Sequence, residues 1–180
     1  MRCAIRAGFL LASSLTIPLT RFDAVHWHWQ APSPLWSEEA MSIQDCRLLE
    51  IPRFADERGS LSVVESTHQI PFEIRRVYYL YDIPAGQVRA AHGHKRLQQL
   101  VVAISGSFDI SIDDGFARRL IRLDRPDRGL YIAPGMWREL NGFSGGAVCV
   151  VLASELYDEQ DYLRDYDQFL AYARAQARVQ

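Results

Sequence analysis

The feature that most limits the possible folds is a succession of short apolar or alternating runs, separated by turn residues, that begins near Ile43. The runs are rich in β-branched and aromatic residues, as β-strands are. About ten short strands at this spacing predict an all-β barrel or a two-sheet sandwich, most simply a Greek-key jelly roll. The Asp-Asp-Gly turn at 113–115 also predicts a hairpin. The runs expected to form strands are CRLLEIPRF, LSVVES, RRVYYLYDI, VRAAHGH, LQQLVVAIS, SFDISID, RRLIRL, GLYIAP, WREL and GAVCVVLAS.

The last part of the sequence has a different pattern. The run ELYDEQDYLRDYDQFLAYARAQA is highly charged and places Tyr162, Tyr166, Phe169 and Leu170 at three- and four-residue steps. Such steps line up on one face of an α-helix. We therefore expect one C-terminal amphipathic helix, packed on the barrel or on a partner.

The first forty residues differ in composition from the rest. They contain a short apolar run that resembles a weak signal peptide without a clear cleavage site and is too short to span a membrane. A second His-x-His pair, His26 and His28, lies in a segment rich in Trp, Pro and Ser that has no strand pattern. We expect residues 1–40 to be a disordered extension or to precede the true start at Met41, and residues 41–180 to form one domain.

Charge and cysteine content exclude several classes of function. The net charge is −2 and the basic residues are scattered, so neither nucleic acid nor a membrane surface is an expected partner. The three cysteines, Cys3, Cys46 and Cys149, have no metal-binding or redox spacing, which favours a reduced, cytoplasmic protein. Cys149 lies in the apolar run AVCVVLA, where we expect a buried thiol.

Two histidines separated by one residue, His92 and His94, mark the candidate site. Side chains alternate along a strand, so both imidazoles point to the same side. Arg89 has the opposite parity, and a bend at Ala90-Ala91 would be needed to bring it to that side. Such a pair serves either as metal ligands or as acid/base groups, because imidazole binds metals and also titrates near neutrality.

The residues around the pair have the spacing of the first cupin motif. Five residues separate Gly86 from His92, four separate His94 from Gln99, and six separate Gln99 from Gly106. This agreement predicts that the jelly roll is a cupin barrel with the histidines in its interior.

Two metal ligands of the cupin pattern are replaced. Gln99 occupies the position of the ligating Glu, and Arg138, after a Pro-Gly turn, occupies that of the third His. Sites of the 2-His-1-carboxylate or three-His type need these groups, and a guanidinium repels a divalent ion. We therefore expect no metal and no other cofactor. Two imidazoles, several arginines and nearby aromatic rings suit proton transfer on a nucleotide-activated sugar.

Several segments, in order and correctly spaced, resemble the bacterial dTDP-4-oxo-6-deoxyglucose 3,4-ketoisomerases, the WxcM-like cupins of deoxyamino-sugar biosynthesis for O-antigen (lipopolysaccharide) or S-layer glycans. The matching segments are DERGSLSVVE, IPFEIRRVYYLYDIP, RAAHGHKRLQQLVVAISGSFDISIDDG, GLYIAPGMWRELNGFS and VLASELYDEQDYLRDYDQFL. The resemblance implies a metal-free homodimer that exchanges N-terminal strands. It also implies an isomerase that moves the keto group of a dTDP-linked 6-deoxyhexose from carbon 4 to carbon 3 through an enediol.

The resemblance implies that His92 and His94 are the catalytic pair. Negative charge develops on oxygen in the enediolate, so a neighbouring hydroxyl or cation must stabilise it. Candidates for this task are Tyr79, Arg58 and Arg138. Further candidates for binding the substrate are Arg76, Arg89 and Lys95 for the diphosphate, Tyr131 and Trp137 beside the ligand, and Gln99 for a sugar hydroxyl. Core packing or surface ion pairing is the alternative for these residues, and at most one of the adjacent Tyr78 and Tyr79 can face the cavity.

Two positions leave the configuration of the product at carbon 4 open. Within the family, Arg at the position of Arg58 and His at that of Arg138 accompany the galacto product. Tyr and Arg at the same positions accompany the gluco product. This chain has Arg at both, which is a mixture of the two patterns.

Three other functions stay open at this stage. A sugar-nucleotide 3,5-epimerase also uses a cupin barrel and a histidine base, although that histidine is usually paired with Asp and carried on different motifs. A metal-dependent cupin such as a dioxygenase would need the two replaced ligands. A non-catalytic sugar-binding cupin would need neither both histidines nor the arginines.

Overall fold

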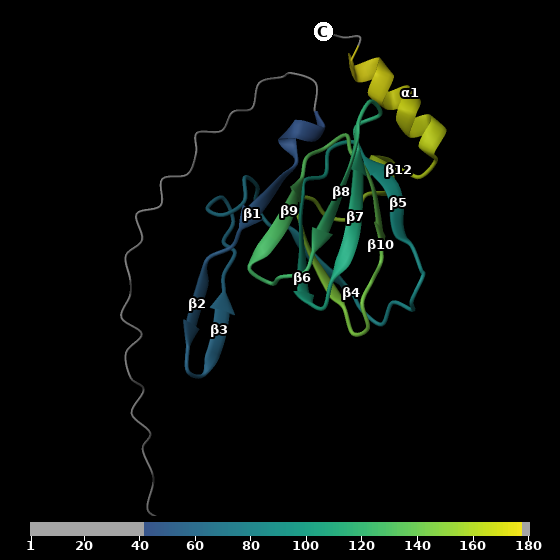
Figure 1. The fold of residues 1–180 in the computed structure, drawn as a ribbon. Helices are drawn as coiled ribbons and strands as arrows, with labels where there is room; N and C mark the ends of the chain where they lie inside the picture. The colour runs from purple at the N-terminus through teal and green to yellow at the C-terminus, as the bar shows by residue number, and fades with distance from the viewer. Residues whose placement is uncertain (1–41, 178–180) are drawn as a thin grey trace, which may run out of the picture. The chain divides into compact units, whose positions relative to one another are not determined.

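The computed structural model describes residues 42–177, so the expectations for residues 1–40, including His26 and His28, lie outside the described residues. The described part is built mostly of β-strands, with one α-helix at its C-terminal end (Figure 1). The elements are η1 (Ile43–Asp45), β1 (Arg47–Glu50), β2 (Arg53–Asp56), β3 (Gly59–Ser62), β4 (Arg76–Leu80), β5 (Arg89–His94), β6 (Gln99–Ser105), β7 (Phe108–Asp113), β8 (Arg118–Leu123), β9 (Arg128–Ile132), β10 (Trp137–Asn141), β11 (Val148–Ala153), η2 (Glu159–Asp161), β12 (Tyr162–Leu163) and α1 (Tyr166–Ala177).

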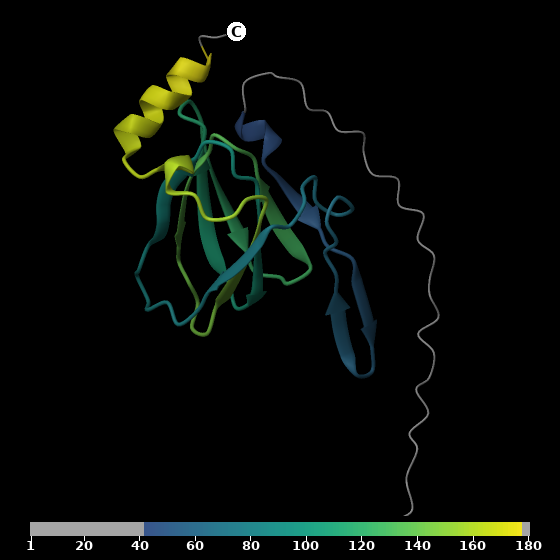
Figure 2. The same ribbon diagram turned by 180° about the vertical axis from the view of Figure 1, so that it is seen from behind.

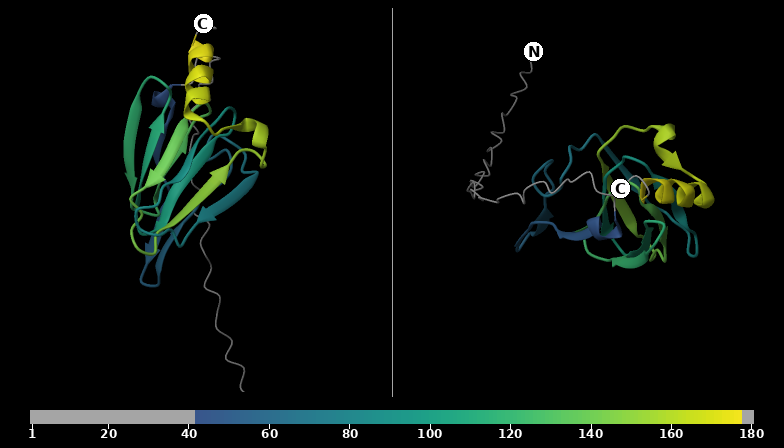
Figure 3. Two further views of the ribbon diagram at one scale, coloured as in Figure 1. Left: turned by 90° about the vertical axis from the view of Figure 1, so that its right-hand side faces the viewer. Right: turned by 90° about the horizontal axis from the view of Figure 1, so that it is seen from above.

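Two five-stranded antiparallel sheets form the barrel (Figure 3). The first sheet has the strand order β1-β9-β6-β11-β4, and the second has the order β12-β5-β10-β7-β8. Most neighbouring strands are distant in sequence, which is the connectivity of a jelly roll rather than of a meander. Fully buried side chains such as Leu130, Ile110 and Ile112 form its core. The predicted fold class is therefore confirmed.

The hairpin predicted at the Asp-Asp-Gly turn joins β7 to β8. The side chain of Asp113 accepts a hydrogen bond from the Gly115 amide at 2.7 Å, and that of Asp114 accepts one from the Phe116 amide at 2.9 Å. Gly115 has a φ of +89°, a left-handed conformation that favours glycine. Turn chemistry that can be recognised from the sequence thus sets the register of this hairpin.

A β-bulge in β5 controls which side chains point into the barrel. Arg138 on β10 is paired with His92, but the next residue, Glu139, is paired with Ala90, so Ala91 is the extra residue. Ala90 and Ala91 both have positive φ values, 69° and 52°. The bulge reverses the alternation, because one additional residue shifts every preceding side chain to the other face. Arg89 consequently lies on the same side as His92.

The C-terminal segment differs from the sequence-based prediction in its extent. The α-helix begins at Tyr166, and the residues before it form the short turn η2 and the strand β12, which is paired with β5. The Asp165 side chain accepts a hydrogen bond from the Gln168 amide at 2.9 Å, as a helix N-cap does. Tyr162, expected on the helix, therefore lies in the second sheet opposite His94. The helix itself is anchored by Phe169, which is fully buried.

The hairpin of β2 and β3 projects away from the two sheets in Figures 1 and 2. Every residue of both strands is exposed. Its two strands carry the paired apolar residues Phe54 and Leu61, which are 41% and 61% exposed. Within residues 42–177, no helix has the length and apolar character needed to cross a membrane.

Candidate active site

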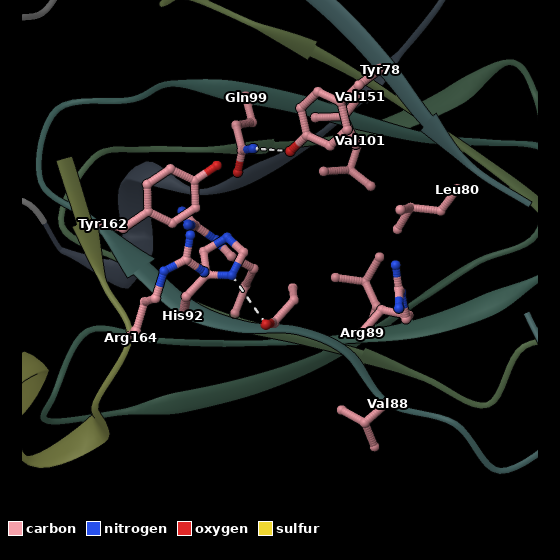
Figure 4. Close-up of a pocket in the computed structure, with 13 residues that line it drawn as sticks. Tyr78, Leu80, Val88, Arg89, His92, Gln99, Val101, Val151, Tyr162 and Arg164 are labelled. Carbon is pink, nitrogen blue, oxygen red and sulfur yellow. Dashed lines mark hydrogen bonds between the residues drawn. The ribbon is translucent and has the colours of Figure 1, made fainter. Parts of the chain in front are cut away.

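A cavity of about 390 Å³ opens between the two sheets (Figure 4). Strands β4, β6 and β11 supply one wall, β5 and β10 supply the other, and residues around β12 close one end. The lining residues are Tyr78, Leu80, Val88, Arg89, Ala90, His92, Gln99, Val101, Arg138, Leu140, Val151, Tyr162 and Arg164. The cavity therefore combines apolar side chains with a comparable number of polar and charged ones, which suits a polar small ligand.

The two histidines lie against each other at one end of this cavity. Their ring centroids are 4.9 Å apart, and the rings are almost perpendicular. His92 lines the cavity, whereas His94 lies deeper and is 1% exposed. The Tyr162 ring contacts both, with centroid distances of 4.9 Å to His92 and 4.2 Å to His94. Both imidazoles therefore lie on the same side of β5, as the His-x-His spacing predicts.

The Nδ1 atom of each histidine lies within hydrogen-bond distance of an oxygen acceptor. His92 Nδ1 lies 3.0 Å from the Ala90 carbonyl oxygen, and His94 Nδ1 lies 2.9 Å from Asp161 Oδ2. A carbonyl and a carboxylate can only accept, so both Nδ1 atoms carry the proton and donate it. The Nε2 atom of each neutral ring is then left with a lone pair. Both imidazoles are thus prepared to act as bases through Nε2.

Arg138 is the most unusual residue of the site. Its side chain is almost completely buried, and none of its three guanidinium nitrogens has a hydrogen-bond partner within the described residues. Burial lowers the pKa of Arg138 from 12.5 to about 10, which still leaves a cation at neutral pH. A buried cation without a counterion is costly, and such costs are usually found where a ligand supplies the missing partner.

Burial and this cation together keep the histidines neutral. The pKa of His92 is lowered to about 4, mainly by burial and then by Arg138. The pKa of His94 is lowered still further by the same two causes in the same order. A neutral imidazole is the form that can accept a proton from a substrate.

Gln99 and Tyr78 form the opposite wall. Gln99 is buried, and its Nε2 donates to the Tyr78 hydroxyl at 2.6 Å (Figure 4). Tyr78 lines this cavity, whereas Tyr79, the tyrosine expected at the site, is 62% exposed on the outer face of β4. Alternation along a strand allows only one of them inside, and the sequence does not say which.

Two arginines lie at opposite ends of the cavity. Arg89 reaches it because of the bulge in β5, and Arg164 enters from the segment after β12 (Figure 4). Arg164 lies over the Tyr162 ring at 4.4 Å and donates two hydrogen bonds to the Glu159 carboxylate. Sequence reasoning did not place Tyr162, Arg164 and Asp161 at the site, because the pattern of their segment predicts an amphipathic helix.

The structure places the other predicted binding residues elsewhere. Tyr131 is buried in the core, where its hydroxyl donates to Gln98 Oε1 at 2.8 Å. Trp137 lies on the face of β10 opposite Arg138 and packs against Phe169 on α1. Both residues are packed in the interior, and neither lines the cavity.

Three predicted cations also lie outside the cavity wall. Lys95 Nζ donates to the Gln160 carbonyl at 2.8 Å and so fastens the η2 turn. Arg76 is half-buried, with its guanidinium 5.3 Å from the centre of the Tyr78 ring. Arg58 is exposed at the tip of the β2–β3 hairpin, where it pairs with Asp56. Of the cations predicted to bind substrate, only Arg89 and Arg138 line this chain's own cavity.

The donor atoms present do not resemble a metal centre. No group of three or more His, Cys, Asp or Glu side chains with suitable geometry occurs within residues 42–177. Next to the two imidazoles lie the amide of Gln99 and the guanidinium of Arg138, which is a poor neighbour for a divalent ion.

Comparison with known proteins shows the family. A family model described as FdtA: WxcM-like, C-terminal, matches residues 44–174. The chain is 43% identical over 126 residues, 70% of its length and 91% of the relative, to a TDP-4-oxo-6-deoxy-alpha-D-glucose-3,4-oxoisomerase of Aneurinibacillus thermoaerophilus.

Solved structures of 3,4-ketoisomerases are also similar to this chain. The WlaRB TDP-quinovose 3,4-ketoisomerase of Campylobacter jejuni is 47% identical, with a TM-score of 0.69 over 72% of this chain and 99% of that one. QdtA, a sugar 3,4-ketoisomerase of Thermoanaerobacterium thermosaccharolyticum in complex with TDP, is 38% identical, with a TM-score of 0.73 over 75% of this chain and 98% of that one. A dTDP-4-dehydrorhamnose 3,5-epimerase of Bacillus anthracis is only 19% identical at a TM-score of 0.59, which shows a shared fold alone. The chain therefore belongs to the FdtA, WxcM-like C-terminal family.

Proposed function

We propose that this protein is a TDP-sugar 3,4-ketoisomerase that converts a TDP-4-keto-6-deoxyhexose into its 3-keto isomer. The observation that carries the proposal is the pair of neutral imidazoles, His92 and His94, each with a bare Nε2 beside the buried cation of Arg138. The related proteins named above act on TDP-linked sugars of this kind. Members at 43% and 47% identity support the same reaction here.

The residues present supply what the reaction needs. A base takes the proton from carbon 3, the C–H electron pair forms the double bond between carbons 3 and 4, and the carbonyl electron pair moves to the oxygen on carbon 4. Protonation of that oxygen gives the enediol. Loss of the proton on the carbon 3 oxygen and return of a proton to carbon 4 then leave the ketone at carbon 3. Electrons are only redistributed within the sugar, so no external oxidant or reductant is required.

Each step has a candidate group in the cavity. His92 lines the cavity and is placed to take the carbon-bound proton, while the deeper His94 is its partner for proton exchange with the oxygens. Arg138 offers the N–H groups of three nitrogens that have no partner within residues 42–177, and these donors would stabilise the developing oxyanion strongly in this buried setting. Arg89, at the end of the cavity away from the histidines, is suited to the diphosphate.

Arg138 supports the gluco configuration at carbon 4 of the product. Arg138, the gluco-type residue of the family pattern, lines the cavity. The relative at 47% identity is a TDP-quinovose 3,4-ketoisomerase. We therefore propose a 3-keto product with the carbon 4 configuration of quinovose.

The proposed enzyme acts as a homodimer. An isolated two-stranded hairpin is marginally stable, and the β2–β3 hairpin has no neighbour within the described chain that buries it. The outer face of β4 also exposes Val77 and Tyr79, at 55% and 62%. Exchange of the hairpin would cover these apolar groups and carry Arg58 to the partner. Light scattering that gives a monomer mass would contradict this part of the proposal.

Both cysteines in the described residues, Cys46 and Cys149, are buried free thiols, in agreement with the expectation for Cys149. Free thiols support the proposal of a reducing compartment, the cytoplasm, for the reaction.

The decisive experiment is incubation with TDP-4-keto-6-deoxyglucose, followed by NMR. The 3-keto isomer should form, and in deuterated water it should carry deuterium at carbon 4. His92→Asn and His94→Asn should each reduce the rate by at least about 100-fold while TDP still binds, because general acid–base catalysis contributes about 10²–10⁴-fold.

His68→Asn is the matched control, since His68 is exposed and lies on a loop outside the cavity. It should leave the rate unchanged. A folded wild-type protein that binds TDP but gives no 3-keto product would refute the proposal. The configuration at carbon 4 follows from the same spectra.

A further inference from the structure

One side chain outside the cavity, that of Asp161, is hydrogen-bonded to the catalytic pair. Asp161 ends the η2 turn and is 4% exposed. Its Oδ2 accepts the hydrogen bond from His94 Nδ1 at 2.9 Å, and its Oδ1 accepts one from the Arg96 amide at 2.8 Å. The Asp161 carbonyl accepts another from the Lys95 amide at 3.0 Å. Both carboxylate oxygens and the backbone are therefore held in one orientation.

The contact connects two segments that are far apart in the sequence. His94 and Asp161 are 67 positions apart in the sequence and meet because β12 is paired with β5 at Tyr162 and His94. The turn that carries the carboxylate is itself capped by Asp158, whose side chain accepts a hydrogen bond from the Gln160 amide at 2.9 Å. The Asp161 carboxylate is therefore held by a capped turn, which a simple surface ion pair would not require.

The two histidines are oriented by chemically different partners. His92 donates to a neutral backbone carbonyl, whereas His94 donates to a buried carboxylate. When a ring takes up a proton at Nε2, a carboxylate at Nδ1 stabilises the resulting imidazolium more strongly than a carbonyl does. His94 Nε2 is buried and has no partner within the described residues, so it is the nitrogen left for proton exchange.

We propose that Asp161 is a positioning residue of the isomerase: it holds His94 in the Nδ1–H tautomer, fixes the plane of its ring and supports the imidazolium formed during turnover. Asp161 does not line the cavity and acts only through His94. The inference rests on the proposed function, but the tautomer of His94 can be measured without any turnover.

Asp161→Asn is the sharpest test, because it keeps the shape and the acceptor for the Arg96 amide. Its NH₂ group would face His94 Nδ1, which must then accept, so the proton moves to Nε2 and the catalytic lone pair is lost. We expect kcat to fall by about 10³-fold or more, in line with the cost of a wrong histidine tautomer in a catalytic triad. KM should change little, since no contact with substrate is removed.

The second readout is the tautomer itself. Long-range ¹⁵N–¹H correlation spectra should show His94 protonated at Nδ1 in the wild type and at Nε2 in Asp161→Asn. Asp158→Asn is the matched control, because Asp158 bonds to no histidine and an asparagine still caps the η2 turn by accepting the Gln160 amide hydrogen bond. It should leave the tautomer unchanged and the rate within about twofold, the small effect usual for exposed positions.

Failure of the inference about Asp161 and failure of the proposed function would give different results. An unchanged His94 tautomer in Asp161→Asn, or a switched tautomer with a wild-type kcat, would overturn the inference. A wild-type protein without isomerase activity would refute the proposed function, while the spectra would still test the positioning of His94. If Asp161→Asn does not fold, Asp161→Ser takes its place in the same spectra, and the loss of a unique Nδ1–H tautomer is then the expected result.

Discussion

Replacing Arg138 by methionine should make the protein more stable and much less active. The guanidinium is 2% exposed and has no hydrogen-bond partner in the described residues, so the folded state bears the cost of burying its charge. Methionine has a similar length and carries no charge. Substitution of a buried ion by a well-fitting apolar side chain is often neutral or stabilising.

The size of the effect follows from the shift that burial causes in the pKa of Arg138. Its pKa falls from 12.5 in water to about 10 in the folded protein. A lowered pKa of a basic group means that folding disfavours its charged form, and the cost is fully present at any pH below about 10. At about 1.4 kcal/mol for each tenfold change, the cost is about 3 kcal/mol. We expect a net gain of about 1–3 kcal/mol in the free energy of unfolding, since methionine does not fill the site perfectly.

Urea denaturation at pH 7.5 and a fixed protein concentration measures this gain, since the stability of a dimer depends on concentration. Arg122→Met is the matched control, because Arg122 is half-exposed and pairs with Asp109 at 3.0 Å. That exposed pair should be worth less than about 1 kcal/mol. In the same samples, the isomerase rate of Arg138→Met should fall by about 10²–10³-fold, the cost of removing an oxyanion donor.

A variant Arg138→Met that is less stable than the control by more than about 1 kcal/mol, the scale of one lost hydrogen bond, would contradict this prediction. That result would mean that the guanidinium has partners in the folded protein in solution. A stable variant with a full rate would instead remove Arg138 from the chemistry.

Three further predictions concern pH, packing and metal. Because burial and Arg138 lower the pKa of His92 to about 4, kcat/KM should stay level from pH 8 to about 5 and decline below about pH 4, whereas Arg138→Met should move this decline to higher pH. Stopped assays in overlapping buffers measure the profile, and a decline centred near pH 6.5 in the wild type would contradict it. Phe169→Ala should lower the free energy of unfolding by about 3–5 kcal/mol in urea titrations, because the ring is fully buried against Trp137 and leaves a cavity. Dialysis against EDTA should leave the isomerase rate unchanged, because Gln99 and Arg138 stand where metal ligands would be; recovery of a lost rate by added divalent metal would disprove this.

Some polar residues of the site could be placed from the sequence, and others could be placed only from the structure. The His-x-His spacing placed both imidazoles on one side of β5, because alternation along a strand is a local property. Whether Arg89 shares that side depended on the bulge at Ala91, which is visible only in the pairing of β5 with β10. The choice between Tyr78 and Tyr79 likewise depended on which face of β4 meets the other sheet.

The strands from β4 to β11, the hairpin at Asp-Asp-Gly and the presence of Gln99 and Arg138 near the histidines could be predicted from the sequence alone, because each depends on side-chain alternation, turn chemistry or motif spacing. The run CRLLEIPRF, expected as one strand, instead forms β1 and β2 in two different sheets. Asp161 could not be placed at the site from the sequence, since the helical spacing of the aromatic residues around it suggested a helix. Only strand pairing across 67 residues brings its carboxylate to His94. The tertiary structure also decided that Arg138 is a buried cation without a partner, because burial depends on every element that surrounds a side chain.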